Sequence, residues 1–206
     1  MGSMVSLPSD TITSNISSGF INYPKAVRSL AGYPEPYLDY LIEYHVTRDY
    51  FECHELLEAY WKSLPKDAAN REMWVGLIQI AVAQYHHRRG NTRGAVMMFR
   101  QAAARIDEDG ASVAGLDAAA LHRLLRERIS ALETLGAAAA FVEFDLPLSD
   151  PELQASCAAI CRTHGYAWGL PSNMADRQLI HRHTLRDRSD VIAARAESAA
   201  MKHGRL

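Results

Sequence analysis

The chain has 206 residues, of which 48% are hydrophobic and 22% are charged, so it is long enough to bury one core. Its formal net charge of −2 provides no overall positive field that would attract nucleic acid or an anionic membrane. We therefore expect no nucleic-acid partner, and no apolar run approaches the ~18 residues that a membrane span needs. Three cysteines, Cys53, Cys157 and Cys161, make no disulfide framework, which predicts a reducing, cytoplasmic location.

The N-terminal segment differs from the rest of the chain. It opens with MGSM, which resembles a cloning remnant, and continues with a Ser/Thr-rich stretch that has no periodicity. It also lacks a basic region followed by an apolar one, which predicts an unexported protein. We expect residues 1–22 to be disordered or derived from a tag.

Helical periodicity begins at Pro34 and continues through the first half of the chain. Capping signals bound the elements: Asp49 and Glu52 have the spacing of a capping box, Asn70 and Asn91 can each cap a helix, and Gly90 suits a left-handed position. The predicted helices are 35–47, 50–64, 71–88 and 92–106. The short connection 65–70 makes the second and third of these antiparallel neighbours.

The second half continues the helical pattern. Residues 107–117 are expected to form a loop, followed by a helix from 118 to about 135, an extended stretch in 136–148, a helix from 151 to about 163 and helical character in 189–202. The sequence therefore predicts an all-α multihelical bundle of about six to seven helices with a central antiparallel helical hairpin. Residues 34–110 form its core, and 111–206 supply additional helices that pack on the same domain.

The stretch YFECHELLEAYW, residues 50–61, places two polar residues, His54 and Glu58, beside an apolar stripe. The helix that follows is apolar on every side, which predicts that its Gln79 is buried and bonded to a neighbouring helix. In the antiparallel pair of helices joined by residues 65–70, residues whose numbers add up to about 134 lie at the same height along the bundle. We therefore expect His54 to lie near Gln79, and Glu58 near Gly76. We expect His54, Glu58 and Gln79 to converge within hydrogen-bond reach, directly or through one water.

Two further polar residues lie toward the far end of the third helix. His86 is two turns beyond Gln79, ~9 Å along the axis from His54, so a small ligand could touch both histidines but one metal ion could not. Asn91 lies at the same end, where the free N–H groups of the next helix favour an anion.

Three interpretations of this polar cluster stay open. In the first it is a structural network that fixes helix register. In the second His54 and Glu58, four residues apart, are ligands of a metal site, although HELLE lacks the second His of a zincin motif. In the third it is a pocket for a small polar ligand. Because two strong ligands hold a metal ion only loosely, we expect no tightly bound metal or cofactor.

Catalysis is the alternative to a structural or binding role. A metal-assisted, hydrolase-like enzyme could use Glu58 or Glu55 as general base and His54 or His86 as its partner. Trp61 fits the core better than a stacking platform. The full set of candidate ligand-binding residues is His54, Glu55, Glu58, Trp61, Gln79, His86 and Asn91. The basic run 181–188 is interpreted as a solvated segment.

The motifs YFECHELLEAYW, GLIQIAVAQYH and RGNTRGA together resemble the signature of the domain of unknown function 309 family. The resemblance covers about residues 38–110. The positions that carry it are Phe51, His54, Glu55, Glu58, Trp61, Gly76, Gln79, His86, Asn91 and Gly94. It implies an all-helical fold and no established activity. We therefore predict a cytoplasmic structural or binding module, and the sequence leaves open whether it forms a homo-oligomer.

Overall fold

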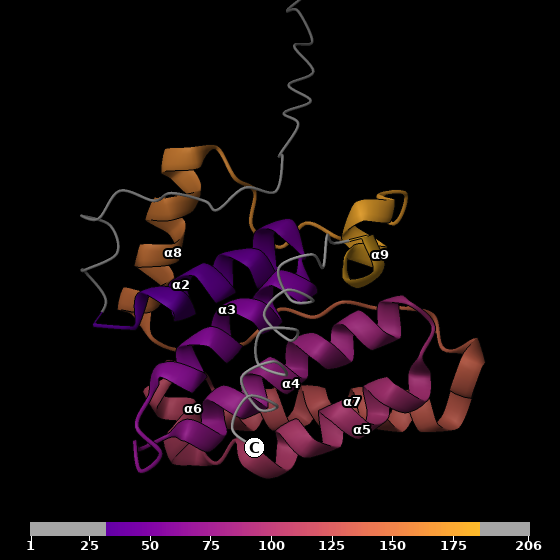
Figure 1. The fold of residues 1–206 in the computed structure, drawn as a ribbon, viewed down its shortest axis with the longest axis horizontal. Helices are drawn as coiled ribbons and strands as arrows, with labels where there is room; N and C mark the ends of the chain where they lie inside the picture. The colour runs from indigo at the N-terminus through magenta and orange to yellow at the C-terminus, as the bar shows by residue number, and fades with distance from the viewer. Residues whose placement is uncertain (1–31, 186–206) are drawn as a thin grey trace, which may run out of the picture.

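The computed structural model describes residues 32–185, which form eight α-helices (Figure 1). The helices are α2 (Glu35–Ile42), α3 (Tyr50–Ser63), α4 (Arg71–Arg88), α5 (Thr92–Arg105), α6 (Glu108–Val113), α7 (Ala118–Leu135), α8 (Pro151–His164) and α9 (Arg177–Leu185). A π-helical turn, η1 (Glu43–Thr47), follows α2, and a 3₁₀ turn, η2 (Gly136–Ala138), follows α7. The expectations for residues 1–22 and 189–202 fall outside the described residues.

The predicted all-α bundle and its central α3–α4 hairpin are confirmed. Several local signals act as expected: the Asp49 side chain accepts from the N–H of Glu52, and Asn91 accepts from Gly94. Gly90 has a φ of +75°. The capping role predicted for Asn70 is wrong, because its backbone is left-handed, with a φ of 63°, and its side chain makes no cap bond. Asparagine tolerates that backbone better than most residues do, so here it completes a turn.

Three elements differ from the sequence prediction. The expected loop 107–117 contains the short helix α6, in which the side chain of the N-cap residue Asp107 accepts from the N–H of Gly110. The helix α9 was not predicted, because it has 9 residues and buries only Ile180, which is too little for a clear periodic pattern. The predicted helix 35–47 ends as α2 at Ile42 and continues as the π turn η1.

The core lies between α4 and the helices around it. Because α4 is apolar on every side, it packs against α3 on one side and α5 on the other, while α7 covers α5 and α8 lies against α2. Figure 1 shows the chain after α7 running back across the bundle to reach α8. Side chains from both halves of the described chain share the main core, including Tyr40, Leu77, Phe99, Leu125 and Leu153.

No helix within residues 32–185 combines the length and apolarity that crossing a membrane would require.

Gly76 of α4 packs against Ile106, the residue at the C-cap of α5. A Cβ at this position would lie 2.4 Å from Cγ1 of the buried Ile106. The sequence had instead placed the carboxylate of Glu58 near Gly76. The glycine therefore admits an isoleucine side chain, which is a packing function.

We expect Gly76→Ala to lower the free energy of unfolding by about 1–3 kcal/mol, because the added methyl group overpacks the site. Chemical denaturation measures this change. In an Ile106→Ala background the clashing Cγ1 is absent, so Gly76→Ala should then be neutral or stabilising. Equal losses in both backgrounds would show that Ile106 is not the obstacle.

Candidate functional site

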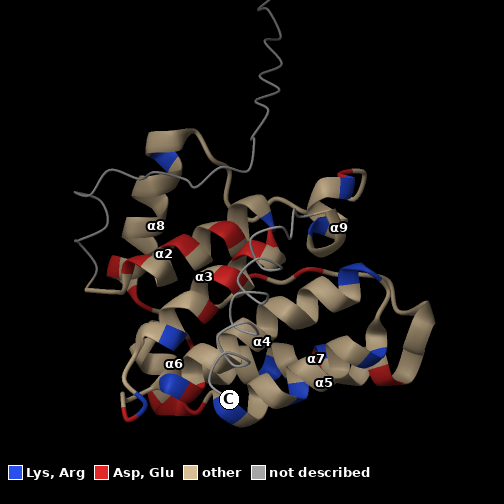
Figure 2. Cartoon of the chain, in the orientation of Figure 1, with Lys and Arg blue, Asp and Glu red and all other residues tan. Residues whose placement is uncertain are grey.

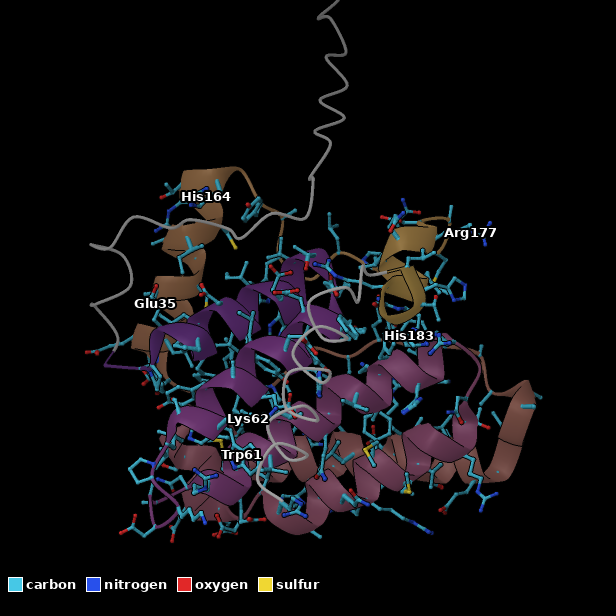
Figure 3. The ribbon with its side chains drawn as sticks, viewed as in Figure 1. Glu35, Trp61, Lys62, His164, Arg177 and His183 are labelled. Atoms are coloured by element: carbon cyan, nitrogen blue, oxygen red, sulfur yellow. The ribbon has the colours of Figure 1, made fainter. Side chains whose placement is uncertain are left out.

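The polar residues of α3 face outward and bond to one another. Nδ1 of His54 lies 3.1 Å from Oε1 of Glu55, and Oε2 of Glu58 lies 2.8 Å from Nζ of Lys62. The side chains of His54, Glu55 and Glu58 are 29%, 33% and 36% exposed. Figure 3 shows Trp61 and Lys62 at the C-terminal part of α3. These residues form a half-buried flank of the helix.

Gln79 is buried, as predicted, but it faces a different neighbour. Its Nε2 donates to Oε1 of Gln101 on α5 at 2.8 Å, and its own Oε1 is buried without a partner. The expected direct hydrogen bonds among His54, Glu58 and Gln79 are therefore not formed. The amide of Gln79 points from α4 toward α5 rather than toward α3.

The remaining candidate residues have structural contacts. Nδ2 of Asn91 donates to Nδ1 of His86 at 3.0 Å, so one asparagine caps α5 and fixes the histidine at the end of α4. Burial, and then the nearby Arg89, lowers the pKa of His86. The guanidinium of Arg71 lies 4.8 Å from the Trp61 ring and donates to the Trp61 carbonyl, which closes the α3–α4 connection.

A buried ion network lies at the other end of α3, where η1 turns into it. The Arg48 side chain is 4% exposed, and Arg48 has a left-handed φ of 58°. Its guanidinium donates to the carbonyls of Tyr44 and Leu170 and, at 2.8 Å, to Oδ1 of Asp145. Burial alone would lower the pKa of Arg48, but Tyr50 and Asp145 raise it, so the side chain is a fixed cation.

A second buried arginine, Arg88 of α4, extends the network. It donates to the carbonyl of Arg48 at 2.6 Å, to the hydroxyl of Ser172 at 3.0 Å and to the carbonyl of Leu179 at 3.1 Å. Its guanidinium also lies 4.8 Å from the Tyr50 ring. Arg88 therefore ties α4 to η1, to the 168–172 loop and to α9.

The carboxylate of Glu143 links Tyr50 of α3 to the loop that contains Ser172. It accepts from the Tyr50 hydroxyl at 3.0 Å and from the backbone N–H of Ser172 at 2.7 Å. On the α9 side, Arg182 pairs with Asp49 and Glu52. Figure 2 shows acidic residues along α2 and α3, the two helices that meet at this network. The acidic groups are each matched by a donor, whereas Arg88 bonds to carbonyls and a hydroxyl, and its Nε is buried without a partner.

A groove of about 440 Å³ lies over the network. Its polar side is formed by Arg48, Glu143 and Asp145, and its other lining residues are Phe141, Val142, Phe144, Gly169, Pro171, Ser172 and Met174. Val142 and Met174 at the groove are 46% and 54% exposed. The groove thus combines a rigid charged floor with apolar walls, which is typical of small-molecule and peptide sites.

The π turn η1 carries two titratable groups, His45 and Glu43, whose pKa values are shifted by burial. The imidazole of His45 donates from Nδ1 to the Leu41 carbonyl, accepts at Nε2 from the N–H of Leu146, and stacks on Trp168 at 4.1 Å. Burial lowers its pKa to about 4, so the ring is neutral. Burial raises the pKa of Glu43 to about 7, despite a hydrogen bond from Thr47 that favours the carboxylate. A π turn of this kind often marks a functional site.

We expect Glu43 to make stability fall as pH rises from 4.5 to about 7. Because the pKa of Glu43 is higher in the folded state than the ordinary 4.5, its protonation favours the folded state. This contribution to stability is complete below about pH 4.5 and is lost as the pH rises to about 7. In Glu43→Gln this loss is absent, so the free energy of unfolding of the variant, relative to the wild type, should rise by at most about 3 kcal/mol over this window.

Denaturant titrations at several pH values test this difference. The exposed Glu127→Gln is the control, and its curve should run parallel to that of the wild type. A parallel curve for Glu43→Gln would contradict the raised pKa.

The described residues contain no group of three His, Cys, Asp or Glu side chains placed to hold a metal ion. His54 and Glu58, the candidate ligands, have Glu55 and Lys62 beside them.

The network was missed by the sequence analysis because its members are distant along the chain. Arg48 and Asp145 are 97 residues apart, and Arg88 and Ser172 are 84 apart. One signal was present: an arginine and an aspartate, Arg48 and Asp49, lie between two predicted helices, where a charged pair can bridge elements.

The described residues form an all-helical module, and its groove is lined by segments that connect the helices, with Arg48, Glu143 and Asp145 on the polar floor. The family model described as "Domain of unknown function (DUF309)" matches residues 37–98. The chain is 44% identical over 165 residues to the Uncharacterized protein YpuF of Bacillus subtilis (strain 168), covering 79% of this chain and 92% of the relative. The chain belongs to the domain of unknown function 309 family. No solved structure matches it.

Proposed function

We propose that the protein is a binding module that holds a partly apolar small ligand in the groove over Arg48. The observation that carries this proposal is the exposure of apolar side chains, Val142 and Met174, beside a floor whose charged groups are already fixed. A preorganised floor lowers the entropic penalty of binding, because the polar groups need not be ordered by the ligand.

Binding is favoured over catalysis by how the groove's ionisable groups are used. The carboxylate of Asp145 is paired with Arg48, and that of Glu143 accepts from Tyr50 and Ser172. A general base needs a lone pair directed at the substrate. Both oxygens of Glu143 accept from protein donors, and Oδ1 of the half-exposed Asp145 is held by Arg48. The proposed ligand therefore meets apolar walls and backbone groups first.

The proposed location is the cytoplasm, because all three cysteines are free and buried. The groove is formed within one chain, so the proposal holds for a monomer and for a homo-oligomer.

A thermal-shift screen of a small-molecule library tests the proposal. Compounds that raise the melting temperature of the wild type should lose their effect in Val142→Lys, which places a charge on the groove wall. The matched control is Met97→Lys, at a residue of α5 that is 52% exposed and lines neither this groove nor the cleft described below. A screen in which no hit loses its effect in Val142→Lys, including one that yields no hit, would count against the groove.

A further inference from the structure

A second cleft, of about 400 Å³, lies away from the Arg48 groove, where the start of α2 meets the α3–α4 connection. Tyr33, Tyr60, Trp74 and Asp150 are among the residues that line it, and we call these four the aromatic cleft. Three aromatic rings and one carboxylate from distant parts of the chain therefore face a common space.

The rings of the aromatic cleft stand at different angles. The Tyr60 and Trp74 rings are perpendicular, at 85°, with their centroids 5.4 Å apart. The third ring, Tyr33, is anchored by its hydroxyl, which donates to Oδ2 of Asp150 at 2.5 Å. Rings at right angles can present more than one π surface to a single bound group.

The position of Tyr33 is fixed by close packing as well as by its hydrogen bond. Gly115, with a φ of +67°, lies beside it, and a Cβ there would come within 2.5 Å of the Tyr33 hydroxyl. The glycine thus leaves room for the tyrosine to reach Asp150.

The charge of the cleft is negative. Among the described residues that line it, Asp150 is ionisable as an acid and none is a Lys, Arg or His. The Tyr33 hydroxyl, and then the N–H of Glu152, lower the pKa of Asp150, so its carboxylate stays ionised. A cation entering the cleft would meet aromatic faces and a carboxylate. The nearby guanidinium of Arg71 is held by the carbonyls of Trp61 and Leu64 and by the Trp61 ring.

We propose that the aromatic cleft binds an alkylated ammonium cation, such as a trimethylammonium group. Such a group is apolar on its surface and positively charged overall, so it suits aromatic faces better than a metal ion or a hydrated ammonium does. This site is separate from the Arg48 groove, and it holds or fails independently of the proposed function.

Two probes of the same shape test the proposal. Choline carries the trimethylammonium group, and 3,3-dimethyl-1-butanol replaces its nitrogen by neutral carbon. NMR titrations following the indole N–H of Trp74, assigned with Trp74→Phe, measure the affinity of each. We expect choline to bind about 10-fold more tightly than the alcohol.

Substitutions test the negative charge of Asp150 separately from its structural role as an N-cap. Asp150 accepts from the first turn of α8, and asparagine is an equally good N-cap, so Asp150→Asn keeps the cap and removes the charge. It should weaken choline binding about 3- to 10-fold and leave the alcohol unchanged. Tyr60→Leu should weaken choline binding by a similar factor. The control is Asp117→Asn, at the N-cap of α7, which should change neither affinity.

Equal affinities for choline and the alcohol would show that the cleft does not recognise the positive charge, and would overturn the proposal. So would an unchanged choline affinity in Asp150→Asn, or the absence of choline binding up to about 10 mM.

Discussion

Replacing Arg48 with methionine is expected to lower the free energy of unfolding by about 2–3 kcal/mol, because the acceptors around a guanidinium that is 4% exposed lose their donor. The carbonyls of Tyr44 and Leu170 lose a donor, and Asp145 loses its ion pair. Urea denaturation measures the change. Arg100→Met is the control, since Arg100 pairs with Glu133 at the surface, and it should cost less than about 1 kcal/mol. Similar losses in the two variants would mean that the Arg48 network is not a stabilising feature.

The left-handed backbone of Arg48 gives the same position a second test. Both Arg48→Ala and Arg48→Gly remove the guanidinium, but glycine adopts a φ of 58° without strain. The glycine variant should therefore be about 1 kcal/mol more stable than the alanine variant. The opposite order would show that the backbone relaxes when the side chain is removed.

Replacing Arg88 with methionine is expected to lower the free energy of unfolding by about 3 kcal/mol and to loosen α9. Arg88 donates to the Leu179 carbonyl of α9 and to Ser172, so its loss removes contacts that hold the 168–185 region on α4. Hydrogen exchange should show a specific loss of protection in 177–185. Figure 3 places two labelled residues of that helix, Arg177 and His183, where this change would be read.

Two controls accompany the Arg88 measurement. Arg93→Met, at an exposed position near the start of α5, should leave stability within about 0.5 kcal/mol and leave the exchange of α9 unchanged. Arg88→Lys should behave like the methionine variant, because an ammonium cannot donate to three acceptors in the plane of a guanidinium. Full protection of α9 in Arg88→Met would contradict the role of this residue.

Local signals explain why most helices could be predicted from the sequence. The caps at Asp49 and Asn91 and the left-handed Gly90 each depend on residues within one turn. In α4 the absence of a polar side was enough to place it at the centre of the bundle. The helices α6 and α9 have 6 and 9 residues, which is too short for a periodic pattern to be recognised, so they were missed.

The candidate site was harder to predict because it depends on rotation and on distant partners. Sequence spacing placed His54 and Gln79 at one level, but it could not show that Gln79 turns toward Gln101. The pairing of Arg48 with Asp145 joins η1 to a stretch with no helical period, and no local pattern relates the two. Structure was needed to show that these segments meet.

Several residues that carry the family resemblance now have physical explanations. Gly76 admits Ile106, and Gly94 lies where a Cβ would come within 2.6 Å of the Asn91 side chain. Asn91 in turn caps α5 and holds His86. These contacts are structural, which is why the proposed binding site lies at the groove over Arg48 rather than on the outer face of α3.

The most direct test of that assignment is an NMR titration of the ¹⁵N-labelled protein with the strongest compound from the thermal-shift screen. If the groove is the binding site, the largest chemical-shift changes will fall on the amides of Val142, Asp145, Gly169 and Ser172. Changes centred on the α3 residues His54, Glu55 and Glu58 would contradict it and return the binding site to the HELLE motif.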